Sequence, residues 1–296
     1  MTVVDLLVPY WGDPAYLRAT VGSVLAQSDP AWRLTVVDDA NPDPWAGPWL
    51  ASLGDDRIRY VRNPENRGIA EVFRQCVDLA EHDLVAVPGS DDLLLPDYVA
   101  VVRAAHARHP AADVIQPGVR VVDEHGRASR PLADEVKQRL VRPRGRGTRV
   151  LAGEPLATSL LHGDWLYWPS LVFRREAVQR TPFRPGLPII LDLALVLDMV
   201  LAGSELVVEP TECFAYRRHS ASASSVKLLD GSRFAGERSY FDLAARLMRQ
   251  RGWRRAERAA RVHVTSRLYA LTLLPTAAAR RDGAAIRTLL RHAFGS

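Results

Sequence analysis

Cysteine is scarce in this chain of 296 residues, because only Cys76 and Cys213 occur. Two cysteines are too few for a disulfide framework or a cysteine-based zinc site, and we expect both as buried, reduced thiols. Long apolar runs are also missing, since no stretch approaches the roughly 20 residues that a membrane-spanning helix needs. The N-terminus lacks the basic segment that opens a secretory signal, so a cytoplasmic protein is expected.

Lysine is equally rare. Lys137 and Lys227 are the only lysines among 39 basic residues, and arginine therefore carries the net charge of +5. The basic excess is concentrated at 142–149 and 246–261. A basic balance favours an anionic partner, which can be a phosphorylated substrate, a membrane surface or nucleic acid, and composition does not choose among the three.

The first 120 residues alternate between apolar, strand-like runs and helical patterns. The runs predict strands at 3–8, 34–37, 58–61 and 84–87, and helices at 14–27, 45–53, 68–80 and from Pro96 onward. Such alternation is typical of a parallel sheet that is covered by helices on both faces. Ligands of these sheets bind beyond the carboxyl ends of the strands, and two Asp-Asp pairs stand at such ends here.

The second half of the chain is less regular. Residues 123–150 are polar and rich in Arg, Gly and Pro, which predicts a mobile loop. After it, the patterns predict a helix at 154–161, a strand or turn near 170–173, a helix at about 190–202, a strand at 206–208 and a wholly helical segment at 231–292.

The two Asp-Asp pairs are the first candidates for chemistry. Asp91 and Asp92 follow the run at 84–87, and adjacent carboxylates there can hold Mg²⁺ or Mn²⁺, which bridges a diphosphate and stabilises a departing nucleotide. Asp38 and Asp39 follow an earlier strand and suit hydrogen bonds to a nucleobase or ribose. Ordinary turns, one of them capping the next helix, explain both pairs equally simply.

Three more groups have both a functional and a structural interpretation. Asp192 opens an apolar stretch, where desolvation raises the pKa of a carboxyl group toward that of a useful base; alternatively, it only interacts with a helix dipole. The run Tyr216–His219, followed by serines at 220–225, suits phosphate or metal binding, or is a basic surface loop. Trp165 and Trp168 suit a stacking platform for an acceptor sugar, or belong to the core.

Taken together, these stretches resemble the family 2 glycosyltransferases of the GT-A fold. The matching segments lie in family order across residues 3–225: Val8–Tyr10 with Leu17 and Ser23–Gln27, Thr35–Asp39, Asn63–Ile69, Gly89–Asp92 with Pro96, Pro169–Glu176, Asp192–Leu197, and Tyr216–His219 with Ser222 and Ser224. Three positions depart from the family pattern. Gly89 replaces the usual first Asp of the DxD motif, Leu191 replaces an acidic residue before the base, and Asp198 replaces an Arg.

The resemblance implies an α/β fold of GT-A type, with a mixed, mainly parallel, Rossmann-like sheet flanked by helices and a helical C-terminal extension. It implies a glycosyltransferase domain at 1–225, with a nucleotide-sugar half at about 1–120 and an acceptor half at about 150–225, followed by the extension at 226–296. We expect the following roles: nucleotide binding by Pro9, Tyr10, Asp38, Asp39, Asn66, Gly68, Ser90 and Asp91; metal binding by Asp91, Asp92 and His219; catalysis by Asp192; and acceptor binding by Trp165 and Trp168.

The activity that the resemblance implies is inverting transfer of a hexose from a nucleotide-diphosphate sugar, with UDP or dTDP favoured. The expected acceptor is a hydroxyl group of a glycan, of a lipid-linked molecule or of a small molecule in cell-wall or natural-product biosynthesis. The expected cofactor is Mg²⁺ or Mn²⁺. Nucleic acid is not expected as a partner. The alternatives are a degenerate, non-catalytic GT-A scaffold, an anionic-ligand binding protein and a sugar-phosphate nucleotidyltransferase. The last of these has a glycine-rich, basic loop after the first strand, where this chain has Pro9–Asp13 instead. We expect the arginine-rich face of the C-terminal helices to be exposed to solvent or to form a homodimer contact. The alternative is peripheral contact with the inner face of the membrane.

Overall fold

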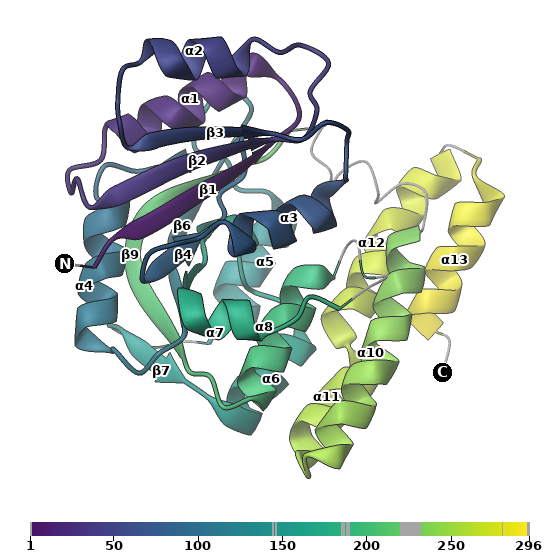
Figure 1. Ribbon diagram of the computed structural model, residues 1–296. Helices are drawn as coiled ribbons and strands as arrows, with labels where there is room; N and C mark the ends of the chain where they lie inside the picture. Colours follow the sequence, from purple (N-terminus) through teal and green to yellow (C-terminus); the bar gives the residue numbers. More distant parts are fainter. Residues whose placement is uncertain are drawn as a thin grey trace.

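The computed structural model describes residues 2–143, 145, 147–184, 187, 190–219, 232–279 and 281–294. These residues form a nine-stranded sheet with helices on both sides (Figure 1). The strands are β1 (Val4–Tyr10), β2 (Trp32–Asp38), β3 (Ile58–Arg62), β4 (Leu84–Ala86), β5 (Leu93–Leu94), β6 (Val114–Val122), β7 (Arg149–Leu151), β8 (Val172–Arg174) and β9 (Leu206–Arg217). Their order is β3-β2-β1-β4-β8-β6-β9-β5, with β7 paired to β9.

The N-terminal half of the sheet is parallel, as the sequence predicts. β1 pairs in parallel with β2 and β4, and β2 pairs in parallel with β3. β8 runs antiparallel to β4 and β6, whereas β6 and β9 are parallel again. The predicted mixed, mainly parallel α/β fold is therefore confirmed. The strand β6, which the sequence patterns did not predict, extends the sheet past β8.

Helices cover both faces of β1 because its side chains alternate. Leu6 and Val8 pack in one core with α1 (Pro14–Leu25), α2 (Ala46–Ser52) and α4 (Tyr98–Arg108). Leu7 packs on the other face in a second core, with α3 (Ile69–Asp78). Cys76 lies in that second core and Cys213 in the first, so the prediction of two buried free thiols is confirmed; burial raises the pKa of both.

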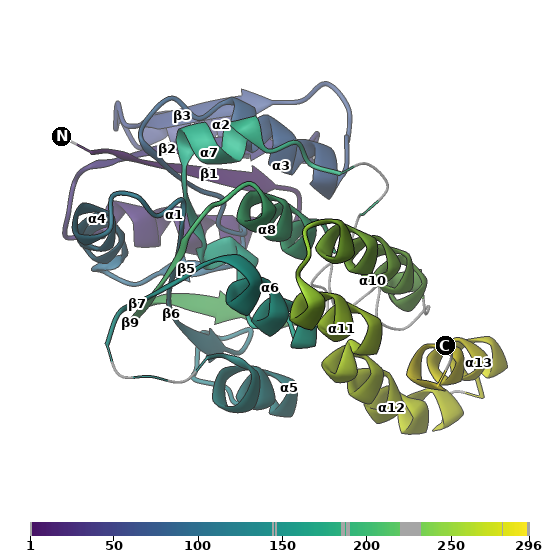
Figure 2. The same cartoon turned by 90° about the horizontal axis from the view of Figure 1, so that it is seen from below.

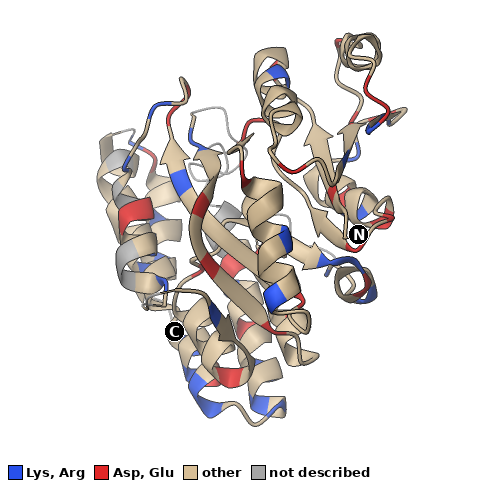
Figure 3. Cartoon of the chain, turned by 90° about the vertical axis from the view of Figure 1, so that its left-hand side faces the viewer, with Lys and Arg blue, Asp and Glu red and all other residues tan. Residues whose placement is uncertain are grey.

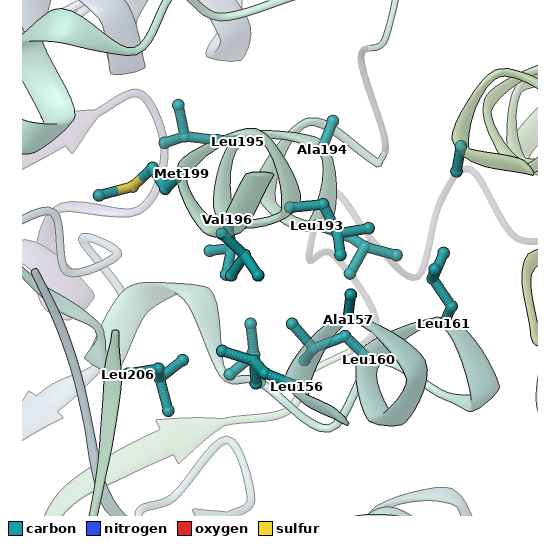
Figure 4. Close-up of a cluster of buried hydrophobic side chains, with 14 of the residues drawn as sticks. Leu156, Ala157, Leu160, Leu161, Leu193, Ala194, Leu195, Val196, Met199 and Leu206 are labelled. Atoms are coloured by element: carbon teal, nitrogen blue, oxygen red, sulfur yellow. The ribbon is translucent and has the colours of Figure 1, made fainter. Parts of the chain in front are cut away.

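The segment at about 150–225, predicted to be the acceptor half, includes two helices that face each other. These are α6 (Gly153–His162) and α8 (Leu191–Leu201), and α7 (Arg175–Arg180) lies between them in the chain. Leu193 and Val196 of α8 point toward Leu156 and Leu160 of α6 (Figure 4). Burial of such side chains is worth about 1.5–3 kcal/mol each, so this contact is a main source of stability for this part of the chain.

The predicted mobile loop at 123–150 is wrong as a description of the whole segment. It contains α5 (Leu132–Val136), a π-helical turn (Lys137–Val141) and β7. Asp134 of α5 is buried and accepts two hydrogen bonds from the Arg218 guanidinium, at 3.1 and 3.0 Å. This contact joins α5 to a distant strand end, and a contact of that kind leaves no local sequence signal.

The C-terminal segment is helical, as predicted. Its helices are α10 (Ser232–Gln250), α11 (Arg254–Val262), α12 (Val264–Ala279) and α13 (Gly283–Phe294). α10 and α11 lie beside α6 and α8, whereas α12 and α13 pack against each other further out (Figure 2). Tyr240, Phe241 and Met248 of α10 join the same core as α6 and α8. The predicted boundary at 225/226 and the serines at 220–225 lie outside the described residues. None of the helices in the described part of the chain combines the length and apolar character of a membrane span.

The positive charge of this segment is partly balanced within it. Arg249 and Arg261 both form ion pairs with Glu257, at 2.8 and 3.0 Å. Basic and acidic residues are interspersed over the face of the molecule shown in Figure 3. The membrane and homodimer contacts of these helices stay predictions.

A buried polar cluster joins three of the C-terminal helices. The Ser266 hydroxyl donates to Glu237, so it accepts a hydrogen bond from Nε2 of His292, which lies 2.7 Å away. His292 is fully buried, and burial lowers its pKa from 6.5 to about 4. His263 has its pKa lowered by burial as well, and its ring stacks on Phe241 with centroids 4.6 Å apart.

This cluster predicts that stability falls in mild acid. Between pH 6.5 and 4 the unfolded chain binds more protons at His292 than the folded chain does. The free energy of unfolding therefore decreases as the pH falls through this range. From this group alone we expect the free energy of unfolding to be about 2 kcal/mol lower at pH 5 than at pH 7. Urea unfolding of wild type and of His292→Gln at both pH values measures it. An equal pH dependence in the two proteins would contradict the assignment.

Candidate active site

The candidate site lies where β1, β2 and β4 end. Tyr10, the last residue of β1, pairs with Asp38, the last residue of β2. β4, the other parallel neighbour of β1, ends at Ala86 and leads directly into the turn Gly89–Asp92. Because these strands are parallel, both Asp-Asp pairs come to the same edge of the sheet, as the sequence predicts.

Asp39 organises the loop that follows β3. Its carboxylate accepts hydrogen bonds from the side chain of Asn63 at 2.9 Å and from the backbone amides of Arg67 and Gly68 at 2.9 and 3.0 Å. Asn66 donates to the Asp39 carbonyl at 3.2 Å. Gly68 has a φ of 80°, which favours glycine at this turn. The predicted residues Asp39, Asn66 and Gly68 therefore form one unit, with Asn66 exposed at its surface.

Asp38 is enclosed and has a structural role. It is fully buried and accepts from the Asn41 amide at 2.7 Å, from the Tyr60 hydroxyl at 2.5 Å and from Arg62 at 2.6 Å. Burial and this hydrogen bond to the Asp38 carboxylate raise the pKa of Tyr60. The prediction that the Asp38 side chain contacts a nucleotide is wrong in this conformation, because the carboxylate faces its own loop.

Pro9 and Tyr10 are buried as well, and nucleotide binding at these two positions stays a prediction. The Tyr10 hydroxyl accepts from Trp45 Nε1 at 3.0 Å and donates to the Gly12 carbonyl at 3.2 Å. The next residue, Trp11, is 60% exposed at the end of β1. Trp11 is therefore a further candidate for contact with a nucleotide. Its position directly after an apolar strand is the sequence signal that could have identified it as one.

Asp91 and His219 come together at this edge although they are far apart in the chain. His219 Nε2 lies 2.8 Å from Asp91 Oδ2, and the Asp91 side chain is 30% exposed. Asp92, in contrast, is buried and accepts a hydrogen bond from the Arg217 amide at 2.9 Å. Burial, reinforced by the charge of Asp91, raises the pKa of Asp92 well above its ordinary value.

The predicted metal triad of Asp91, Asp92 and His219 is wrong as a set. Within the described ranges, no group of three or more His, Cys, Asp and Glu side chains is arranged to hold a metal ion. Asp91 and His219 do fit a divalent cation, since they place one carboxylate oxygen and one imidazole nitrogen side by side. Mg²⁺ and similar ions commonly use one or two protein ligands and take the rest from substrate phosphates and water.

Arg217 and Thr20 fix the turn that carries these aspartates. The Arg217 guanidinium donates to the carbonyls of Asp91 at 2.6 Å and Glu124 at 2.9 Å. The Thr20 hydroxyl lies 2.9 Å from the Ser90 carbonyl and 2.8 Å from that of Asp92. The backbone of Ser90 is thereby held in place. Nucleotide binding by Ser90 stays a prediction.

Asp192 lies in the first turn of α8, as predicted, and is partly exposed. Its Oδ1 accepts from the Leu193 amide at 2.8 Å. The two departures from the family pattern on this helix have structural roles. Leu191 is buried, and Asp198 forms a double hydrogen bond with Arg184, with both distances 2.7 Å.

The predicted acceptor platform of Trp165 and Trp168 is wrong. Trp165 is 1% exposed and donates to the Ser159 hydroxyl at 3.1 Å. Trp168 is 7% exposed and packs against Phe73 and Phe173, with ring centroids 5.5 and 5.4 Å apart. The core alternative holds for both, because each ring is surrounded by apolar side chains rather than open to a sugar.

Gly89 is required by the packing of the two carboxylates above it. A Cβ atom at this position would lie 2.5 Å from Asp91 Oδ1 and 2.8 Å from Asp92 Oδ2. An aspartate here, as in the usual DxD pattern, would displace both neighbours. The glycine is therefore part of how this chain arranges its turn.

We expect Gly89→Ala to lower the free energy of unfolding by about 1–3 kcal/mol, because Asp92 is buried and has little room to move. Gly22→Ala is the matched control, since a Cβ at Gly22 meets nothing within 4 Å and lies on α1. That substitution should be neutral or stabilise the helix by up to about 1 kcal/mol. Urea unfolding compares the two, and equal stabilities would disprove the packing argument.

Comparisons with known proteins agree with this geometry. The family model described as "Glycosyl transferase family 2" matches residues 5–161. The putative glycosyltransferase EpsE of Bacillus subtilis is 28% identical over 125 residues, which cover 42% of this chain and 45% of EpsE. The putative colanic acid biosynthesis glycosyl transferase WcaA of Escherichia coli is 27% identical over 104 residues, or 34% of this chain and 37% of WcaA. This chain thus matches less than half the length of these two relatives.

A solved structure extends the likeness of the fold over almost the whole chain. The crystal structure of TarS 1–349 from S. aureus in complex with UDP-GlcNAc superposes with a TM-score of 0.63 at 15% identity, covering 97% of this chain and 90% of that one. At this identity the match concerns the fold. Since the family model spans more than half of the sequence, the chain belongs to glycosyl transferase family 2.

Proposed function

We propose that this protein transfers a sugar from a nucleotide-diphosphate donor to an acceptor hydroxyl. The observation that carries the proposal is the meeting of Asp91 with His219, 128 residues apart, at the carboxyl edge of the sheet. Beside it lie the loop that Asp39 organises and the exposed ring of Trp11. A binding module with no catalytic role would not need a partly exposed carboxylate beside an imidazole at this edge.

The donor side supports a nucleoside diphosphate. The exposed side chain of Asn66, in the loop that Asp39 organises, suits hydrogen bonds to a ribose, and the exposed indole of Trp11 offers a face on which a base can stack. Two crystal structures of TarS are complexes with UDP-GlcNAc and with UDP, which favours UDP among the nucleotides, with dTDP as the second choice.

Asp91 and His219 are the residues that would hold Mg²⁺ or Mn²⁺. When bound, such a cation offsets the negative charge of the diphosphate leaving group. The imidazole of His219 favours Mn²⁺ of the two, because nitrogen ligands suit transition metals better than Mg²⁺. Arg217 and Thr20 keep the Asp91 backbone in place, so the carboxylate is positioned before the donor binds.

Asp192 is the proposed general base. It would take the proton from the acceptor hydroxyl as that oxygen attacks the anomeric carbon from the face opposite the diphosphate. One C–O bond forms while the bond to the diphosphate breaks, so the configuration inverts and no covalent enzyme intermediate forms. WcaA is named for colanic acid biosynthesis, which favours a glycan acceptor here over a small molecule.

The donor site is tested first by thermal shift. We expect UDP or a UDP-sugar at 100-fold excess over its Kd to raise Tm by about 5 °C, and the rise to need Mn²⁺ or Mg²⁺. Asp91→Asn and His219→Gln should each abolish the metal-dependent rise in Tm. Glu176→Gln, at an exposed position on α7, is the control and should show the same metal-dependent rise as wild type. If no nucleotide shifts the folded wild-type protein, the chain is a non-catalytic scaffold and the proposal fails.

The base is tested separately. Asp192→Asn should lower kcat by about 100-fold or more, because general-base catalysis contributes roughly that much. The donor Kd should stay unchanged, since the base serves the acceptor. Asp198→Asn on the same helix is the control and should keep its activity per folded molecule. Weakened donor binding by Asp192→Asn, or unchanged turnover, would count against the assignment.

A further inference from the structure

The side chain of Tyr16 contacts both residues that bring the end of β9 to the candidate site. Its ring lies 5.0 Å from the imidazole ring of His219, measured between centroids, and the two planes are tilted by 43°. The guanidinium carbon of Arg217 lies 4.9 Å from the centroid of the same Tyr16 ring. Contacts of both kinds favour particular orientations of the groups involved. Tyr16 is therefore placed to determine how the imidazole is oriented.

Tyr16 is itself held in a defined place, in the first turn of α1. Asp13 caps this helix, since its carboxylate accepts a hydrogen bond from a backbone amide of the first turn at 2.8 Å. One turn after Tyr16, the Thr20 hydroxyl lies 2.9 Å from the carbonyl of Ser90, in the turn that carries Asp91. The ring of Tyr16 and the turn of Asp91 are therefore fixed relative to each other through α1.

His219 depends on such contacts for the orientation of its ring. It lies two residues beyond the end of β9, so the pairing of that strand does not fix its side chain. Its Nε2 lies 2.8 Å from Asp91 Oδ2, which sets the position of one nitrogen. The χ2 torsion of histidine is broad, so this contact leaves the plane of the ring undetermined. The Tyr16 ring, packed against the imidazole, restricts that plane.

We propose that Tyr16 is a positioning residue of the cation site, whose ring orients His219 and so gives the site a preference for Mn²⁺ over Mg²⁺. The proposal rests on the proposed function, in which Asp91 and His219 hold the cation. A carboxylate oxygen serves both ions, whereas an imidazole nitrogen suits Mn²⁺ better than Mg²⁺. A ligating histidine binds well only when its ring is held in place, and loss of a supporting contact typically costs about 10- to 100-fold in metal affinity. The preference therefore depends on the contact between Tyr16 and His219 as well as on His219 itself.

The test is a titration of the full chain with Mn²⁺ in the presence of UDP, in which EPR measures the free Mn²⁺ and Mg²⁺ is added as a competitor. A titration of UDP alone gives the blank. We expect Tyr16→Leu to raise the Kd for Mn²⁺ about 10-fold and to leave the Kd for Mg²⁺ nearly unchanged, because Mg²⁺ relies mainly on oxygen ligands. Tyr16→Phe, which keeps the ring that makes both contacts, should keep most of the wild-type preference.

His219→Gln provides the background that shows whether Tyr16 acts through the histidine. Adding Tyr16→Leu to His219→Gln should not raise the Kd for Mn²⁺ further, because the contact on which Tyr16 acts is already lost. Tyr269→Leu, at a partly buried tyrosine of α12, is the control for loss of packing in general and should leave both Kd values unchanged. Tyr16→Met, which fills space without an aromatic ring, takes the place of Tyr16→Leu if that variant does not fold.

Two results would overturn the role of Tyr16. One is an unchanged ratio of the Kd values for Mg²⁺ and Mn²⁺ in the folded Tyr16→Leu or Tyr16→Met protein. The other is an equal rise of the Kd for Mn²⁺ with and without the His219 side chain. Failure of the proposed function is distinct from both, because it shows in the wild-type protein, which then binds neither UDP nor Mn²⁺ together with UDP.

Discussion

The contact on which the candidate site depends is that of Arg217 with the turn after β4. Its backbone amide holds the Asp92 carboxylate, its guanidinium holds the Asp91 and Glu124 carbonyls, and the guanidinium also lies 4.9 Å from the centroid of the Tyr16 ring. These hydrogen bonds join the end of β9 to segments that lie 93 to 126 residues away in the sequence. Because Arg217 is buried, the bonds are shielded from water and hold Asp91 where His219, two residues further along, can reach it.

Several buried carboxylates in and near the site are stabilised in the same way, by hydrogen bonds. Asp38, Asp39, Asp92 and Asp134 are all buried beside strand ends, and each accepts hydrogen bonds from backbone amides, hydroxyls or guanidinium groups. A buried carboxylate is costly unless it is satisfied in this way, so these residues hold loops in one arrangement. The aspartates proposed for chemistry, among them Asp91, are the ones that stay partly exposed. Structural and functional carboxylates are thus separated by burial, even where they are adjacent in the chain.

The proposed acceptor side is supported by segments that are distant in sequence. Asp192 lies on α8, and the apolar core of this helix includes Leu156 of α6 and Tyr240 of α10. Because α10 shares its apolar core with α6 and α8, the C-terminal helices support the acceptor side directly. A substitution in α10 that loosens this core would therefore be felt at the proposed base, even though no family motif lies in that helix.

The sequence by itself determined the alternation of strands and helices, the Asp-Asp pairs at strand ends and the family resemblance, because these follow from local periodicity and from residue order. The tertiary structure alone decided that Asp91 is partly exposed and Asp92 is buried, that Trp165 and Trp168 belong to the core, and that Lys137 lies in a π-helical turn. The reason is physical: burial and hydrogen bonding depend on partners such as Arg217 and Arg218, which lie some 80 to 130 residues away along the chain. Adjacent identical residues can therefore have opposite roles, and only the packed chain distinguishes them.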